Sequence, residues 1–156
     1  MEPIILPAHV REAEAILKLQ YLCYQTEAVL YDDYTIAPLT QSLTDLLSEY
    51  DTHTLLVACF GEEVVGSVRG QIREETCHIG RLIVHPRFQR RGLGTRLMLA
   101  IEEHFGHAAR YELFTGHRSE NNLRLYYKLG YQRFREEMVS PQLRLVFLEK
   151  RGASLH

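Results

Sequence analysis

The stretch Gln89-Arg90-Arg91-Gly92-Leu93-Gly94 is the most informative part of this sequence. It follows an apolar run, residues 79–84, that predicts a strand, and it precedes Thr95 and a run of helical periodicity up to residue 101. A basic turn with glycines between a strand and a helix is typical of an anion site, because the first N–H groups of a helix are free and its dipole is positive there. Glycine also lets the backbone approach a ligand closely. The stretch therefore predicts a phosphate or pyrophosphate site.

The spacing of the glycines excludes two better-known phosphate loops. A P-loop needs Lys and then Ser or Thr directly after its last glycine, whereas Thr95 and Arg96 follow Gly94. A dinucleotide-binding fingerprint needs a third glycine where this chain has Leu97. The loop is therefore a phosphate-site candidate of another kind.

A second motif, Leu125-Tyr126-Tyr127-Lys128-Leu129-Gly130-Tyr131, ends an expected helix with Ser119 as its candidate N-cap and Gly130 as its C-cap. A strand candidate, residues 111–115, lies between the two motifs. In this order the pair resembles the GNAT superfamily of acyl-CoA-dependent N-acetyltransferases. The family motifs Q/R-x-x-G-x-G/A and L-Y-x-K-L-G-[FY] are matched by residues 89–94 and 125–131.

The order of expected elements, β-α-α-β-β-β-α-β-α-β-β, predicts a mixed α/β fold and agrees with the order in this family. We expect one domain over residues 1–156, with a central mixed sheet of about seven strands and helices on both faces. Leu93, Leu97, Ile101 and Phe105 should form the buried stripe of one helix. A second helix near residues 39–50 has Thr40 as a possible cap, and a strand at residues 143–149 is a candidate edge for a homodimer.

Composition narrows the function further. The 156 residues carry a net charge of −2, which argues against general nucleic-acid binding. Cys23, Cys59 and Cys77 have no C-x-x-C spacing and predict reduced thiols in a cytoplasmic protein. No signal peptide or membrane-spanning segment is recognisable, and no histidine pair has the spacing of a metal site, so we expect neither a membrane partner nor a metal.

The resemblance implies that acetyl-CoA is the co-substrate. Backbone N–H groups from Arg90 to Thr95 should hold its pyrophosphate, and the main chain of the preceding strand should pair with the pantetheine amides like an added strand. An N–H group in that strand also suits the thioester oxygen. The residues implied in cofactor binding are Leu82, Ile83, Val84, Gln89, Arg90, Arg91, Gly92, Leu93, Gly94, Thr95, Asn122 and Lys128.

Tyr126 aligns with the family's general-acid tyrosine, which protonates the departing thiolate. The alternative is an ordinary core aromatic on an apolar helix face. The general base is a choice among several groups: His78 occupies the position of a catalytic glutamate in histone-type relatives, Glu74 and Glu75 precede it, and many relatives use a water chain. A partly exposed strand histidine without a catalytic role is the alternative for His78.

The first helices usually form the acceptor wall in this family. Here Glu27, Tyr31, Asp32 and Asp33 lie in that segment, and carboxylates beside aromatic faces suit a cationic amine. A solvated loop with core tyrosines is the alternative. We expect acetyl transfer to a primary amine, with a small cationic amine favoured, by direct attack in a ternary complex. Other possibilities are a protein lysine or N-terminus as acceptor, a CoA-binding sensor without turnover, or a nucleic-acid-binding module.

Overall fold

The computed structural model describes residues 2–152. Within them, seven strands form one sheet: β1 (Ile4–Pro7), β2 (Thr54–Phe60), β3 (Glu63–Arg73), β4 (Thr76–Val84), β5 (Arg110–Gly116), β6 (Gln132–Met138) and β7 (Arg144–Arg151). The helices are α1 (Ala13–Tyr31), α2 (Ala37–Thr40), α3 (Leu43–Glu49), α4 (Leu93–His104) and α5 (Glu120–Lys128), with 3-10 turns η1 (Val10–Glu12) and η2 (Pro86–Phe88). The predicted mixed α/β fold is confirmed.

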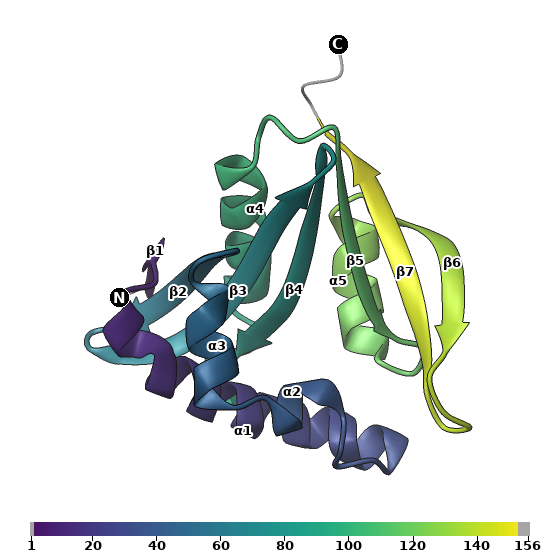
Figure 1. The fold of residues 1–156 in the computed structure, drawn as a ribbon, viewed down its shortest axis with the longest axis horizontal. Coiled ribbons are helices and arrows are strands. Elements are labelled where there is room, and N and C mark those ends of the chain that lie inside the picture. Colours follow the sequence, from purple (N-terminus) through teal and green to yellow (C-terminus); the bar gives the residue numbers. More distant parts are fainter. Residues whose placement is uncertain (1, 153–156) are drawn as a thin grey trace.

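The strand order is β1-β2-β3-β4-β5-β7-β6 (Figure 1). Neighbouring strands are antiparallel except β4 and β5, which are parallel and pair only between residues 76–78 and 110–112. Beyond these residues the two strands diverge, and Figure 1 shows them separating toward the carboxyl end of β4. Residues 79–84 of β4 therefore have a strand neighbour only on the β3 side.

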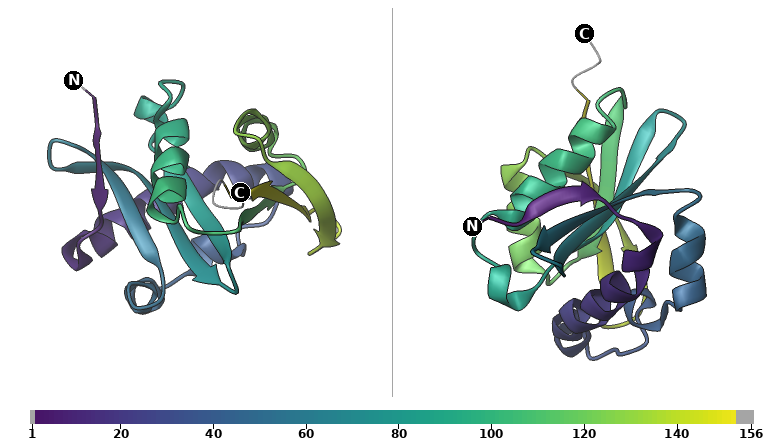
Figure 2. Two further views of the ribbon diagram at one scale, coloured as in Figure 1. Left: turned by 90° about the horizontal axis from the view of Figure 1, so that it is seen from above. Right: turned by 90° about the vertical axis from the view of Figure 1, so that its left-hand side faces the viewer.

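Helices cover both faces of the sheet (Figure 2). On one face, Leu97 and Ile101 of α4 pack in a core cluster that also contains Tyr126 of α5. On the other face, Ile16 of α1 and Leu46 of α3 belong to a second cluster. The predicted stripe of α4 is buried throughout, which confirms its helical phase. No helix in residues 2–152 combines the length and apolarity that a membrane crossing requires.

Two details of the predicted fold are wrong. The expected second helix is two short helices, and Ser42 rather than Thr40 is the N-cap: the Ser42 hydroxyl accepts a hydrogen bond from the Asp45 N–H at 3.1 Å. Thr40 ends α2 instead, because Gln41 is extended and breaks the helix. The strand expected at an edge, β7, lies between β5 and β6, since the final hairpin turns outward and leaves β6 at the edge.

A buried polar cluster joins β3 to α1, α2 and α3. Arg69 is only 3% exposed, and its guanidinium donates to Glu49 at 3.0 Å and to Gln20 at 2.7 Å. Gln20 in turn donates to the Pro38 carbonyl at 2.8 Å and to Gln41 at 3.0 Å. Buried charge is costly unless it is paired and hydrogen-bonded, so this cluster fixes where the three helices meet the sheet.

Candidate active site

β4 carries a bulge close to the point where it separates from β5. Ser67 of β3 pairs with Ile83 and Arg69 pairs with Gly80, so β4 has two residues where β3 has one. The extra residue is accommodated by Arg81, whose φ of 52° is left-handed. A bulge bends a strand and re-aims its side chains and peptide groups. The bulge lies within residues 79–84, the stretch of β4 that has no neighbour on the β5 side. Leu82, Ile83 and Val84, which were predicted to hold the cofactor, belong to the same stretch.

The predicted anion loop leads directly from β4 into α4. Arg90 and Gly92 have positive φ angles of 64° and 79°, and α4 begins at Leu93. Left-handed residues beside a helix start turn successive N–H groups toward one point, which is the geometry of an anion nest. The Gln89 side chain donates to the Val84 carbonyl at 3.0 Å and ties the loop to the strand end. The loop and the divergent part of β4 thus form one continuous surface.

Tyr126 points from α5 into the same region. It is 7% exposed, and within residues 2–152 its hydroxyl makes no hydrogen bond. Burial raises its pKa, and electrostatic interaction with Tyr24 and Glu27 of α1 raises it further. The phenol is therefore fully protonated at neutral pH and available as a donor, and these two α1 side chains are close enough to act on it.

Glu27 is held in a hydrogen-bond network between α1 and the start of α5. Its carboxylate accepts from the Ser119 hydroxyl at 2.8 Å and from the Asn122 amide at 3.4 Å. The Tyr31 hydroxyl is 2.8 Å from the Ser119 hydroxyl, and Asn122 also donates to Thr115 at 3.3 Å. Burial raises the pKa of Glu27, and the bond from Ser119 opposes that shift. A carboxyl with a raised pKa beside a buried tyrosine is typical of a catalytic site.

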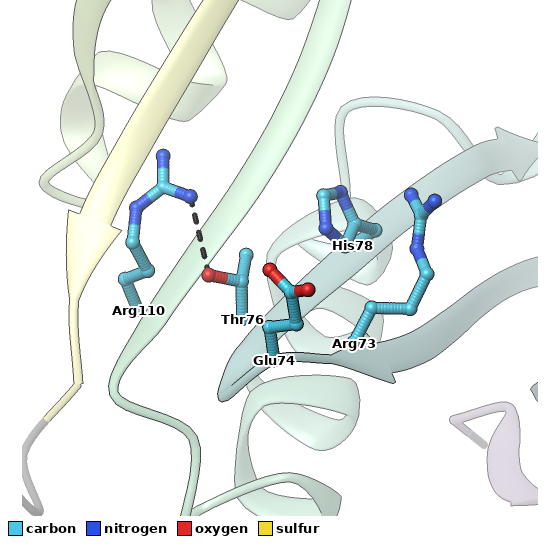
Figure 3. Close-up of a pocket in the computed structure, with 5 residues that line it drawn as sticks. All are labelled: Arg73, Glu74, Thr76, His78 and Arg110. Carbon is cyan, nitrogen blue, oxygen red and sulfur yellow. Dashed lines mark hydrogen bonds between the residues drawn. The ribbon is translucent and has the colours of Figure 1, made fainter.

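His78 lies elsewhere, in an open pocket on the paired part of β4 (Figure 3). The pocket is lined by Arg73, Glu74, Thr76, His78 and Arg110. The pKa of His78 is lowered by burial and then by Arg73, while Glu112, 3.8 Å away, opposes the shift. The structure thus brings His78 together with Glu74, and does not bring either into contact with Glu27 or Tyr126. Their catalytic role stays a prediction.

The remaining predicted residues are divided between the network and the surface. Glu27, Tyr31 and Asn122 belong to the network described above. Asp32 is the left-handed C-cap of α1, and the exposed Asp33 accepts from the Thr35 N–H at 2.8 Å, as in a tight turn. Lys128 is exposed in the last turn of α5.

Three residues were not predicted from the sequence as site residues: Tyr24, Ser119 and Arg81. Tyr24 and Glu27 are three positions apart and therefore share a helix face, which was a usable signal. Ser119 occupies the predicted N-cap position, but its side chain makes no capping bond and binds Glu27 instead. Nothing in the sequence marks Arg81, because its position depends on the bulge.

Comparison with known proteins identifies the family. A model described as the acetyltransferase (GNAT) family matches residues 14–131, which include the anion loop and Tyr126. The chain belongs to the acetyltransferase (GNAT) family. As a GNAT protein it is an acyltransferase, and the predicted resemblance is confirmed. A search of curated proteins found no match for this GNAT chain.

Solved structures share its fold. The PaiA N-acetyltransferase of Thermoplasma acidophilum, in complex with coenzyme A, has a TM-score of 0.80 at 16% identity, covering 97% of this chain and 99% of that one. YncA of Salmonella typhimurium, a putative acetyltransferase with acetyl-CoA, has a TM-score of 0.77 at 17% identity, covering 97% and 94%. The ribosomal-protein-S18-alanine N-acetyltransferase of Escherichia coli has 0.77 at 13% identity, covering 99% of each.

Proposed function

We propose that this GNAT protein transfers an acetyl group from acetyl-CoA to a primary amine by direct attack in a ternary complex. The observation that carries the proposal is the divergence of β4 and β5 between an anion loop and a buried tyrosine. A CoA molecule is an anionic nucleotide joined to an extended pair of amides and a thioester, and these three features match the loop, the free strand edge and the tyrosine. Similar folds are described with coenzyme A and acetyl-CoA.

The cofactor is placed by backbone groups. N–H groups of residues 90–95 bind the pyrophosphate, favoured by the dipole of α4. The main chain of residues 82–84 pairs with the pantetheine amides as an added strand would. Holding both ends fixes the thioester next to the bulge, so that the acetyl carbonyl is presented to an amine entering from the α1 side.

The chemistry requires two proton transfers. The amine nitrogen attacks the carbonyl carbon, the carbon–sulfur bond breaks, and the thiolate takes the proton of Tyr126. The proton lost by the new amide nitrogen goes to a base, for which Glu27 is the first candidate because it accepts a hydrogen bond from Asn122, one helical turn before Tyr126 on α5. His78 is the second candidate, reached through water. No covalent intermediate on the protein is needed.

Paired variants decide between the two bases. Glu27→Gln is expected to lower kcat about tenfold, since a general base typically contributes that much or more. Glu27 must be deprotonated to act as the base, so kcat/KM should fall as the pH falls through the raised pKa of Glu27. In Glu27→Gln this decrease of kcat/KM at acidic pH should disappear. His78→Gln, the matched control, should keep both kcat and this decrease. The reverse pattern, measured by initial rates between acidic and neutral pH, would assign the base to His78.

The acceptor is proposed to be a small primary amine, with a protein lysine or N-terminus as the second class. Glu27 supports an ammonium group at the site, while Asp32 and Asp33 lie in the turn after α1, where their acceptor role stays a prediction. The test is acetyl-CoA-dependent thiol release with polyamines, aminoglycosides, amino acids, lysine peptides and peptides beginning with alanine. Turnover with one class supports the proposal. Acetyl-CoA binding by calorimetry without turnover of any acceptor would favour a non-catalytic CoA sensor.

A further inference from the structure

Arg81 is the charged side chain at this site for which the catalytic account has no use. It occupies the bulge of β4 and is only partly exposed. Its Nε is buried without a hydrogen-bond partner, and within residues 2–152 its side chain forms no ion pair. An arginine in a functional region normally satisfies its fork of donors with a carboxylate or phosphate. The Nε of Arg69 also lacks a partner, but Arg69 is paired with Glu49, whereas Arg81 has no carboxylate partner within residues 2–152.

Arg81 lies two residues before Ile83, which packs in the cluster that contains Ile16 and Leu17 of α1. Its charge acts on Tyr24 of α1, lowering the pKa of a phenol that burial raises, and on the guanidinium of Arg69. Tyr24 in turn acts on Tyr126. Arg81 thus shares with Tyr126 a common neighbour on α1, on the face from which the amine approaches.

Neither of the nearby carboxylates neutralises Arg81. Glu49 is paired with Arg69 at 3.0 Å, and Glu27 is bound to Ser119 and Asn122. The anion loop that suits the pyrophosphate lies beyond the end of β4, after Val84, and Arg81 precedes that end on the strand itself. The missing anion is thus not supplied by the chain or by the diphosphate of the cofactor.

Space for a ligand is present beside Arg81. Gly80 shares the bulge, and a Cβ atom built on it would meet no atom within 4 Å. By contrast, a Cβ on Gly66 or Gly70 of the adjacent strand would come within 3.0 Å or 2.9 Å of a core side chain. The backbone next to Arg81 is therefore open, whereas these two positions on β3 are filled.

We propose that Arg81 binds a carboxylate of the acceptor, so that the substrate carries both an amine and a nearby carboxylate, as an amino acid does. The inference rests on the proposed acetyl transfer and narrows its substrate class. The ammonium end lies toward Glu27 and the carboxylate toward Arg81, which orients the nitrogen at the thioester. A free amino acid and a peptide with an acidic first residue both have this chemistry.

Binding and turnover are measured separately to test it. Free amino acids, the corresponding amino acid amides, and dipeptides beginning with Asp or Glu are titrated by calorimetry into the protein saturated with CoA. The acids should bind about tenfold or more tightly than their amides, as a charge-assisted pair implies. The dipeptides show whether the carboxylate comes from a free amino acid or from an acidic first residue of a peptide. Equal binding of acids and amides to the unmodified protein would overturn the inference, whatever the turnover.

Variants separate this role from others that Arg81 is suited to play. Arg81→Gln should remove the preference for the acid and raise the KM for the acid more than the KM for its amide, and Arg81→Lys should restore part of the preference. Arg133→Gln removes the same charge on β6 and should change neither. A loss of kcat in Arg81→Gln that is equal for acids and amides would assign the residue to oxyanion stabilisation and reject carboxylate binding. If the unmodified protein binds the acids more tightly than the amides but turns over neither, acetyl transfer is rejected while carboxylate binding by Arg81 still stands.

Discussion

Replacing Tyr126 with Phe is expected to lower kcat by about a hundredfold, because the departing thiolate then has no positioned acid. The ring should keep its place: it packs against Tyr131, with ring centroids 6.0 Å apart, and no hydrogen bond of the hydroxyl to residues 2–152 is lost. The KM for acetyl-CoA should change little. Initial rates of thiol release at saturating acceptor measure this effect directly.

The chain contains a matched control in the next residue. Tyr127 is 43% exposed, whereas Tyr126 is buried, so Tyr127→Phe removes the same hydroxyl from the surface of α5. It should retain the kcat of the unmodified protein. If both variants retained it, Tyr126 would be a core aromatic, and the thiolate would have to take its proton from water.

Replacing Glu49 with Gln is expected to cost about 3 kcal/mol of unfolding free energy. The substitution keeps the shape of the side chain but leaves the Arg69 cation, 3% exposed, without a carboxylate. Removing one partner of a buried ion pair typically costs about 3–5 kcal/mol, and Glu49 is 22% exposed, so we take the lower end. Because Arg69 also binds Gln20 and Gln41, the loss should loosen α1 and α3, and with them the acceptor side of the site.

Urea denaturation, with an exposed pair as control, measures that cost. Glu63 pairs with Arg87 at 2.7 Å, and both side chains are largely exposed, so Glu63→Gln should change the unfolding free energy by less than about 1 kcal/mol. If Glu49→Gln and Glu63→Gln lose similar amounts of unfolding free energy, the ion pair of Arg69 stabilises the fold no more than an exposed ion pair does. The ratio of the two losses is therefore the informative quantity.

The sequence predicted the local structure around the candidate site. Gly92 ahead of an amphipathic run marked the turn into α4, which depends on neighbours within a few residues. Tyr126 was singled out by the resemblance to the family, and its catalytic role stays a prediction. The stripe of α4 was equally local.

The features of the site that could not be predicted from the sequence depend on contacts between distant segments. Glu27 and Ser119 are joined because α1 meets the start of α5, and the left-handed conformation of Arg81 arises because β4 has one residue more than β3 at the bulge. The resemblance to the family placed Glu27 in the acceptor wall, and the structure shows in addition that its carboxylate accepts hydrogen bonds from Ser119 and Asn122 of the α5 region. The order of the last strands, β5-β7-β6, could not be predicted either. Either strand of a terminal hairpin can pair with its neighbour without a change in the hydrophobic pattern.

A crystal structure of this GNAT protein with CoA tests the central claim most directly. We expect the diphosphate against the N–H groups of residues 90–95, the pantetheine beside residues 82–84, and the sulfur within hydrogen-bond reach of the Tyr126 hydroxyl, about 3.5 Å. A CoA bound outside the opening between β4 and β5, or one whose sulfur points away from Tyr126, would contradict it.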